Sequence, residues 1–177
     1  MVRMNDQMTE TINRGKALFD AAYRGDAGAV DALLIAGAPL DARDRRGNTP
    51  LMVSAANGHA DVAELLIEWG ADVNTSDLTG RTPLMVAAVG GHADTTRLLL
   101  EHNAMPNAAT VDGLTALMYA SMFRHKAVCV TLIAAGASVS ARDRDGVSAS
   151  DRARLHGDLE MLGLLYLAMP ITSPLAA

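Results

Sequence analysis

Residues 47–74 read GNTPLMVSAANGHADVAELLIEWGADVN, and residues 80–107 repeat this pattern 33 positions later as GRTPLMVAAVGGHADTTRLLLEHNAMPN. A sequence that resembles itself at a fixed step of this size folds as a stack of similar units, because each unit buries its apolar face against the next. The 177 residues suit one domain or one short array of such units. We therefore predict that a repeat array occupies most of the chain.

Hydroxyl and turn residues recur at the same step and predict a pair of short helices in each copy. A hydroxyl oxygen before the first helix can accept a bond from a free backbone N–H, and the residues in that place are Thr49, Thr82, Thr115 and Ser148. A left-handed residue is expected to end the second helix, and the residues in that place are Gly37, Gly70, Asn103 and Gly136. The polar, glycine-containing segments between copies are expected to be loops.

Further steps of 33 residues extend the array to five repeats, of which the first and last are degenerate. Atypical end repeats are expected of a stack, because each end faces solvent on one side. The predicted parts are a polar N-terminal extension at 1–14, a repeat domain at 15–169 and a tail at 170–177. The repeats are expected at about 15–43, 44–76, 77–109, 110–142 and 143–169.

The stretch TPLMVSAANGHADVAELLIEWGADVN closely resembles the ankyrin repeat in its Thr-Pro-Leu start, Gly-His turn, Leu-Leu run and Gly-Ala-Asp-Val-Asn finish. The resemblance covers residues 17–168 and implies an all-α ankyrin-repeat solenoid of helix-turn-helix units joined by β-hairpin-like loops. One departure is consistent, since Met52, Met85 and Met118 stand where the family usually has His. That His normally helps to tie neighbouring repeats, so we expect packing to replace polar ties here. We associate the Thr-Pro-Leu-Met start with bacterial members.

Motifs and charge argue against catalysis and against nucleic acid. The sequence contains no phosphate loop, no HExxH and no Ser-His-Asp spacing. His59, His92 and His125 lie one repeat apart, too far to share a metal ion, and are expected to cap the second helix or bond across the turn. Net charge is −5, and six Arg balance six Asp in the connecting segments. We predict a protein that is not an enzyme, with no cofactor, no metal and no nucleic-acid partner.

Neither end of the chain shows a clear targeting signal. The N-terminal residues lack the apolar core of a secretory signal, and the apolar stretch 161–177 is short for a membrane span. We expect a cytoplasmic protein without membrane contact, whose single cysteine, Cys129, lies in the core. Helix 159–167 is apolar on too many sides for an exposed cap. We favour a monomer in which the tail covers it, and a dimer through this helix stays open.

In ankyrin arrays the concave side, formed by the hairpins and the first helices, usually carries recognition. The resemblance implies a non-catalytic adaptor or scaffold, with a dedicated inhibitor or immunity protein as the alternative and a secreted bacterial effector as a third option. Positions where the copies differ are the expected partner-binding residues: Tyr23, Arg45, Arg46, Leu78, Arg81, Val111, Leu114, Met122, Phe123 and Arg144. We expect the apolar ones in repeats three and four to form the centre, unless Phe123 folds inward. Trp69 is expected to be a second contact point or a lid over the helix ends.

Overall fold

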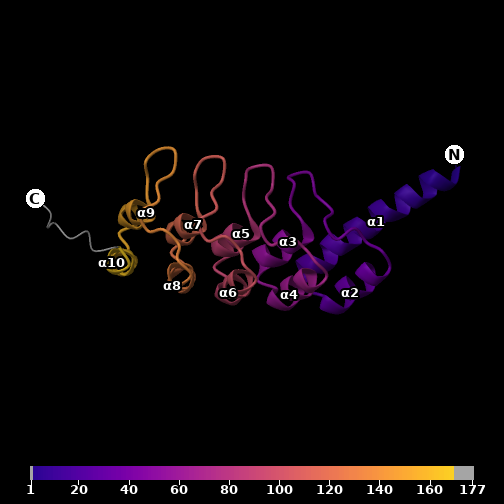
Figure 1. Ribbon diagram of the computed structural model, residues 1–177, viewed down its shortest axis with the longest axis horizontal. Helices are drawn as coiled ribbons and strands as arrows, with labels where there is room; N and C mark the ends of the chain where they lie inside the picture. Colours follow the sequence, from indigo (N-terminus) through magenta and orange to yellow (C-terminus); the bar gives the residue numbers. More distant parts are fainter. Residues whose placement is uncertain (1, 170–177) are drawn as a thin grey trace, which may run out of the picture.

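The computed structural model describes residues 2–169, which form ten α-helices in five consecutive pairs (Figure 1). The helices are α1 Val2–Arg24, α2 Ala27–Ile35, α3 Pro50–Asn57, α4 Ala60–Glu68, α5 Pro83–Gly90, α6 Ala93–Glu101, α7 Ala116–Met122, α8 Lys126–Ala134, α9 Ala149–Leu155 and α10 Leu159–Leu167. The first helix of each pair packs on the first helices of its neighbours, and the loops between pairs project in a row on one side (Figure 1). This confirms the predicted all-α solenoid of helix-turn-helix units.

The predicted caps begin the first helices of the later pairs. The hydroxyl of Thr49 accepts from the backbone N–H of Met52, and Thr82 and Thr115 repeat this bond in the next two pairs. Ser148 forms a capping box with Asp151, in which each side chain satisfies the other's backbone N–H. Asn103, where the other copies have glycine, adopts a left-handed φ of 66° at the end of α6. Local residues therefore define most helix boundaries.

The core consists of columns of small and branched residues that run through the stack. Met52, Met85 and Met118 are each 1% exposed, so the expected methionine column is buried. Cys129 is also fully buried, and burial raises the pKa of its thiol to about 12. A thiol in this setting is a packing residue and not a nucleophile.

The first pair differs from the others because α1 is continuous for 23 residues. The boundary expected between residues 14 and 15 therefore falls inside a helix. No proline interrupts this segment, and Arg14 pairs with Glu10 one turn earlier at 2.5 Å. The helix extends beyond the first hairpin, at the N-terminal end of the stack (Figure 1). The tail at 170–177, which we expected to cover α10, lies outside the described residues.

Polar bonds between pairs come from the Gly-His turns. His59, His92 and His125 begin the second helices but make no side-chain cap there, contrary to one of the two roles expected for them. Each ring Nε2 instead bonds a backbone carbonyl at the end of the first helix of the preceding pair. These carbonyls belong to Tyr23, Ala56 and Val89, at 2.9, 3.0 and 3.0 Å. The histidines of the Gly-His turns therefore keep polar ties between repeats, while Met52, Met85 and Met118 contribute packing.

A glycine at the end of the preceding pair's first helix makes each of these contacts possible. A Cβ on Gly58 would lie 2.5 Å from Nδ1 of His92, the histidine of the following pair. The fourth pair breaks the pattern, since Arg124 stands in the glycine place with a φ of 62°. In the next pair, Asp158 stands at the place that His59, His92 and His125 hold in the earlier pairs. Arg124 Nε donates to Oδ2 of Asp158 at 3.1 Å. An ion pair therefore replaces the histidine bond at the last junction.

Candidate protein-binding surface

Backbone hydrogen bonds hold the hairpins in one row. Within a hairpin, the N–H of Asp77 donates to the carbonyl of Arg81 at 2.9 Å. Between hairpins, Leu78 N donates to Arg46 O at 3.0 Å, Val111 N to Thr79 O at 3.1 Å, and Arg144 N to Asp112 O at 2.9 Å. Side chains on this row are therefore presented from a backbone with fixed spacing.

Four of the predicted residues share one groove between the hairpins and α7. Arg45, Arg46, Leu78 and Arg81 line a space of about 550 Å³ together with Tyr119. Leu78 is 76% exposed and so offers an apolar surface that this chain does not use. A concave surface with cationic, aromatic and aliphatic side chains is a typical setting for a binding hot spot.

Arg81 is held in place by a buried acid. The side chain of Asp77 is fully buried and lies 2.7 Å from Nη2 of Arg81. Burial by itself raises the pKa of Asp77, but hydrogen bonds from Thr79 and Arg81 outweigh it and the pKa is lowered. The carboxylate therefore stays charged and fixes the guanidinium, which reduces the entropy lost when a partner binds.

Tyr119 was not among the residues predicted from the sequence. It lies on α7 in the column that contains Val53 and Val86, and it is half-buried at the base of the groove. Burial raises the pKa of its phenol, so the hydroxyl is protonated at neutral pH and can donate a hydrogen bond. The equivalents of Tyr119 in the other copies are Asp20, Val53, Val86 and Arg152, and this mixed column was the signal that could have identified the position as partly exposed.

Two other predicted residues lie beside this groove. Tyr23 is 64% exposed and shares a smaller hollow of about 220 Å³ with Arg81 and Asn57, so the surface continues toward the first pair. Arg144 lies 3.9 Å from Asp112, with both side chains exposed. This ion pair connects the last two hairpins and is worth little by itself.

The expected apolar centre in the third and fourth pairs is only partly exposed. Val111 is 53% exposed on its hairpin, whereas Leu114 is half-buried and packs against the core. Met122 is also half-buried. Phe123 does not fold inward, because it is 48% exposed and stacks on His125 with ring centroids 6.3 Å apart. Their role in partner binding stays a prediction.

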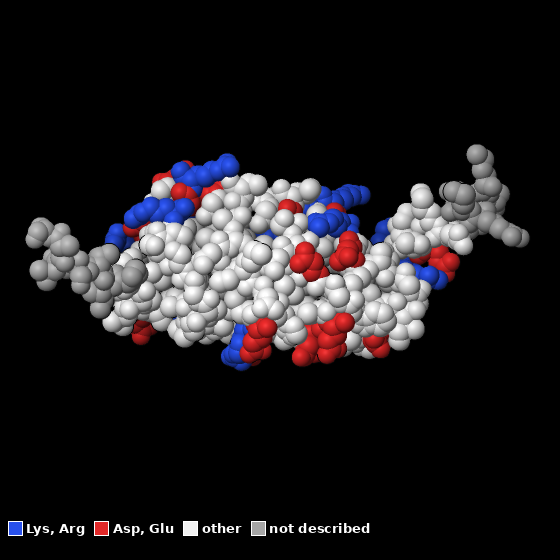
Figure 2. Space-filling model, in the orientation of Figure 1, with Lys and Arg blue, Asp and Glu red and all other residues white. Residues whose placement is uncertain are grey.

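Charges are distributed unevenly over the molecule. In the view of Figure 2, charged side chains gather at hairpins and along the edge formed by α4 and α6, and much of the surface between them is uncharged. The exposed acids of α4 are Asp61, Glu64 and Glu68. Trp69, at the end of this helix, donates from Nε1 to Asp31 at 3.1 Å and is 42% exposed. It therefore ties the second pair to the first.

The family model described as ankyrin repeats (3 copies) matches residues 2–77 and 75–143, well over half of the chain. The chain belongs to the ankyrin repeat family. Ankyrin repeats are generally protein–protein interaction modules and are typically non-catalytic. The fifth helix pair of this ankyrin array, α9 and α10, lies beyond the matched residues. A comparison with curated proteins found no match.

Membrane-spanning helices and clustered metal ligands are both absent from the part of this ankyrin array that the structure describes. Within residues 2–169, no helix is both long and apolar enough to cross a bilayer. The same residues contain no group of three or more His, Cys, Asp or Glu placed to hold a metal ion. In particular, His59, His92 and His125 each bond a separate backbone carbonyl.

Proposed function

We propose that this ankyrin array is a non-catalytic adaptor that holds a partner protein on its concave face. The observation that carries the proposal is the groove between the hairpins and α7, where Arg81 is fixed by Asp77 beside the exposed Leu78. A fixed cation next to an unused apolar side chain favours binding over catalysis.

The chemistry of the groove indicates what the partner presents. Asp77 neutralises Arg81, which leaves Arg45 and Arg46 facing only Asp112 among the charged residues that line the groove. We expect the partner to place an apolar side chain against Leu78 and a carboxylate near the two arginines. Tyr119 would then contact the apolar side chain from the base of the groove.

The test is a binding measurement on two matched variants. A Leu78→Ala, Tyr119→Ala double variant removes the apolar wall and base of the groove. An Ile35→Ala variant removes a side chain of α2 that is 71% exposed, but away from the groove. With a partner captured from the native cell, the double variant should bind roughly ten- to hundred-fold more weakly and the control should bind as wild type. Unchanged binding by the double variant would place the site elsewhere, with Phe123 the next residue to replace.

The adaptor and inhibitor alternatives differ in what happens to the partner. Exposed apolar residues on separate surfaces, Leu78 on a hairpin and Leu167 on α10, favour an adaptor that contacts more than one molecule. An adaptor should recover partners that remain active when bound. Recovery of a single enzyme whose activity is lost in the complex would instead establish an inhibitor.

A further inference from the structure

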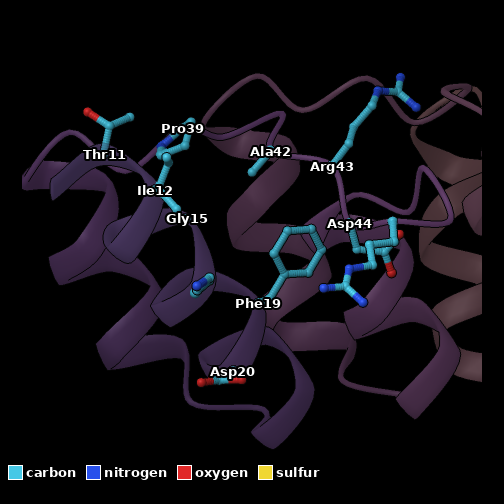
Figure 3. Close-up of a pocket in the computed structure, with 11 residues that line it drawn as sticks. Thr11, Ile12, Gly15, Phe19, Asp20, Pro39, Ala42, Arg43 and Asp44 are labelled. Carbon is cyan, nitrogen blue, oxygen red and sulfur yellow. The ribbon is translucent and has the colours of Figure 1, made fainter. Parts of the chain in front are cut away.

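Another hollow lies at the N-terminal end of the stack, between α1 and the first hairpin (Figure 3). It has a volume of about 610 Å³, and its walls include Ile12, Phe19, Pro39 and Ala42. The ring of Phe19 points from α1 toward the loop segment that carries Ala42 (Figure 3). We refer to this mainly apolar hollow as the notch.

The notch exists because the first pair has no hairpin before it. Phe19 occupies the place of Met52 in the next pair, 33 residues later. Met52 is 1% exposed, whereas Phe19 is only half-buried. Residues 11–15, which correspond to the hairpin positions 44–48, belong instead to α1. The helix therefore leaves open a space beside the first hairpin that another hairpin fills in the later pairs.

The near edge of the first hairpin has unused backbone groups. The N–H of Leu78 donates to the preceding hairpin at 3.0 Å, but the equivalent N–H of Arg45 meets no acceptor within residues 2–169. Similarly, Ser76 O accepts from Arg43 Nη1 at 2.8 Å, whereas the equivalent carbonyl of Arg43 meets no donor in that part of the chain. A parallel strand bonds its neighbour through such a pair, the C=O of one residue and the N–H two positions later.

We propose that the notch binds an extended segment of a partner protein, which pairs with the backbone edge at 43–45 and places an apolar side chain over Phe19. The hairpin row supplies the precedent, because the same backbone position bonds a neighbouring segment at three successive junctions. Strand addition of this kind takes affinity from backbone bonds and specificity from the pocket for the side chain. This binding mode goes beyond the concave-face proposal and adjoins that groove only at Arg45.

Charge around the notch indicates the residue next to the apolar one. Lys16 and Arg45 are exposed, and neither forms an ion pair among the described residues. The two acids in the wall are Asp44, which already accepts from the backbone N–H of Arg46 and Asn48, and the exposed Asp20. With Arg43, the cations of the wall still outnumber these acids by one. The segment that fits therefore carries an acidic residue beside its apolar side chain.

Two matched pairs of variants separate the contributions. Residues 44–47 form a turn closed by a bond of 3.0 Å from Gly47 N to Asp44 O, and proline is favoured at its second position. Arg45→Pro thus removes the N–H and the charge, whereas Arg45→Ala removes only the charge. A Cβ on Gly15 would lie 3.4 Å from Pro39 Cγ and 3.7 Å from Ala42 Cβ. Gly15→Ala therefore fits, while the larger side chain of Gly15→Leu enters the notch.

The probe is a random heptapeptide phage library panned on the full chain, followed by fluorescence polarisation with the enriched peptides. We expect peptides with an apolar residue beside Asp or Glu. Their affinity should fall about ten-fold or more with Arg45→Pro and Gly15→Leu, and about three-fold or less with Arg45→Ala and Gly15→Ala. The Leu78→Ala, Tyr119→Ala variant should bind them as wild type, which keeps this test independent of the concave-face proposal. Thermal unfolding checks that all variants are folded.

Three results would overturn the proposal. The first is a panned library without enriched peptides. The second is peptides that bind Arg45→Pro and Gly15→Leu as tightly as wild type. The third is self-association in sedimentation velocity that Arg45→Pro abolishes while peptide binding is absent, since the occupant would then be a second copy of the chain.

Discussion

Replacing Gly58 with alanine should destabilise the stack much more than an ordinary change from glycine to alanine. Gly58 has a φ of 77°, and a Cβ in the left-handed region costs about 1–2 kcal/mol. The new methyl group would also lie 2.5 Å from Nδ1 and 2.8 Å from Cγ of His92. Displacing that ring adds about 1–3 kcal/mol of overpacking and weakens its bond to the carbonyl of Ala56. We expect a total loss of about 2–5 kcal/mol.

Gly136→Ala is the matched control. Gly136 has a φ of 85°, and a Cβ built on it has no atom within 4 Å. It should therefore show only the backbone cost of about 1–2 kcal/mol. His92→Ala, combined with Gly58→Ala, removes the ring that the new methyl group meets. A double-mutant cycle should then give a coupling energy of about 1–3 kcal/mol between the two positions.

Urea unfolding monitored by far-UV circular dichroism gives these free energies, and Trp69 fluorescence reports the first two pairs separately. Two probes are needed because a repeat array can unfold in parts. Equal losses for Gly58→Ala and Gly136→Ala would refute the steric argument. So would a cycle without coupling, because His92 would then not be what excludes a side chain at residue 58.

Three further predictions concern single residues. Hydrogen bonds from Thr79 and Arg81 lower the pKa of Asp77 against the opposing effect of burial. Its charged form should therefore stabilise the fold above about pH 4, and this stabilisation should be lost as the pH falls through the folded-state pKa. Asp77→Asn should flatten the acid side of a curve of urea midpoint against pH, and an unchanged curve would contradict this. Cys129, with a pKa raised to about 12, should react with a thiol reagent such as DTNB no faster than the chain unfolds, and rapid labelling of the native protein would show that it is accessible. Arg124→Gly should change stability by less than about 1 kcal/mol, because relief of the left-handed φ offsets loss of an ion pair whose arginine is 60% exposed. Asp158→His should lower the thermal unfolding temperature of the wild-type protein, and should lower it less in the Arg124→Gly background.

The period of 33 residues was sufficient to predict the architecture, because shared positions such as Thr49, Thr82 and Thr115 act locally and cap their helices in the same way. It also placed Arg45, Leu78 and Arg81 on one surface, since hairpin positions at equal steps lie side by side. The continuity of α1 was missed because the repeat pattern contains no information on residues that precede its first copy.

Departures from the period were harder to interpret from the sequence. Arg124 and Asp158 differ from their columns separately, and only their contact across two pairs shows that one substitution allows the other. Tyr119 was missed for a related reason: two of its equivalents, Val53 and Val86, are apolar and two, Asp20 and Arg152, are charged, so the column has no common character. The place of Tyr119 in the groove depends on the hairpin residues that surround it, which the periodic pattern does not describe.

The contact between each turn and the following pair means that the order of the pairs matters. A pair that ends its first helix with glycine leaves room for the histidine that precedes the second helix of the next pair. The pair that carries Arg124 instead needs the shorter Asp158 at that place in the next pair. Exchanging the third and fourth pairs would therefore place Arg124 against a histidine and leave Asp158 without its arginine. Duplication of the second or third pair, in contrast, would repeat a compatible junction. Lengthening of this array by gene duplication is thus easiest in its middle.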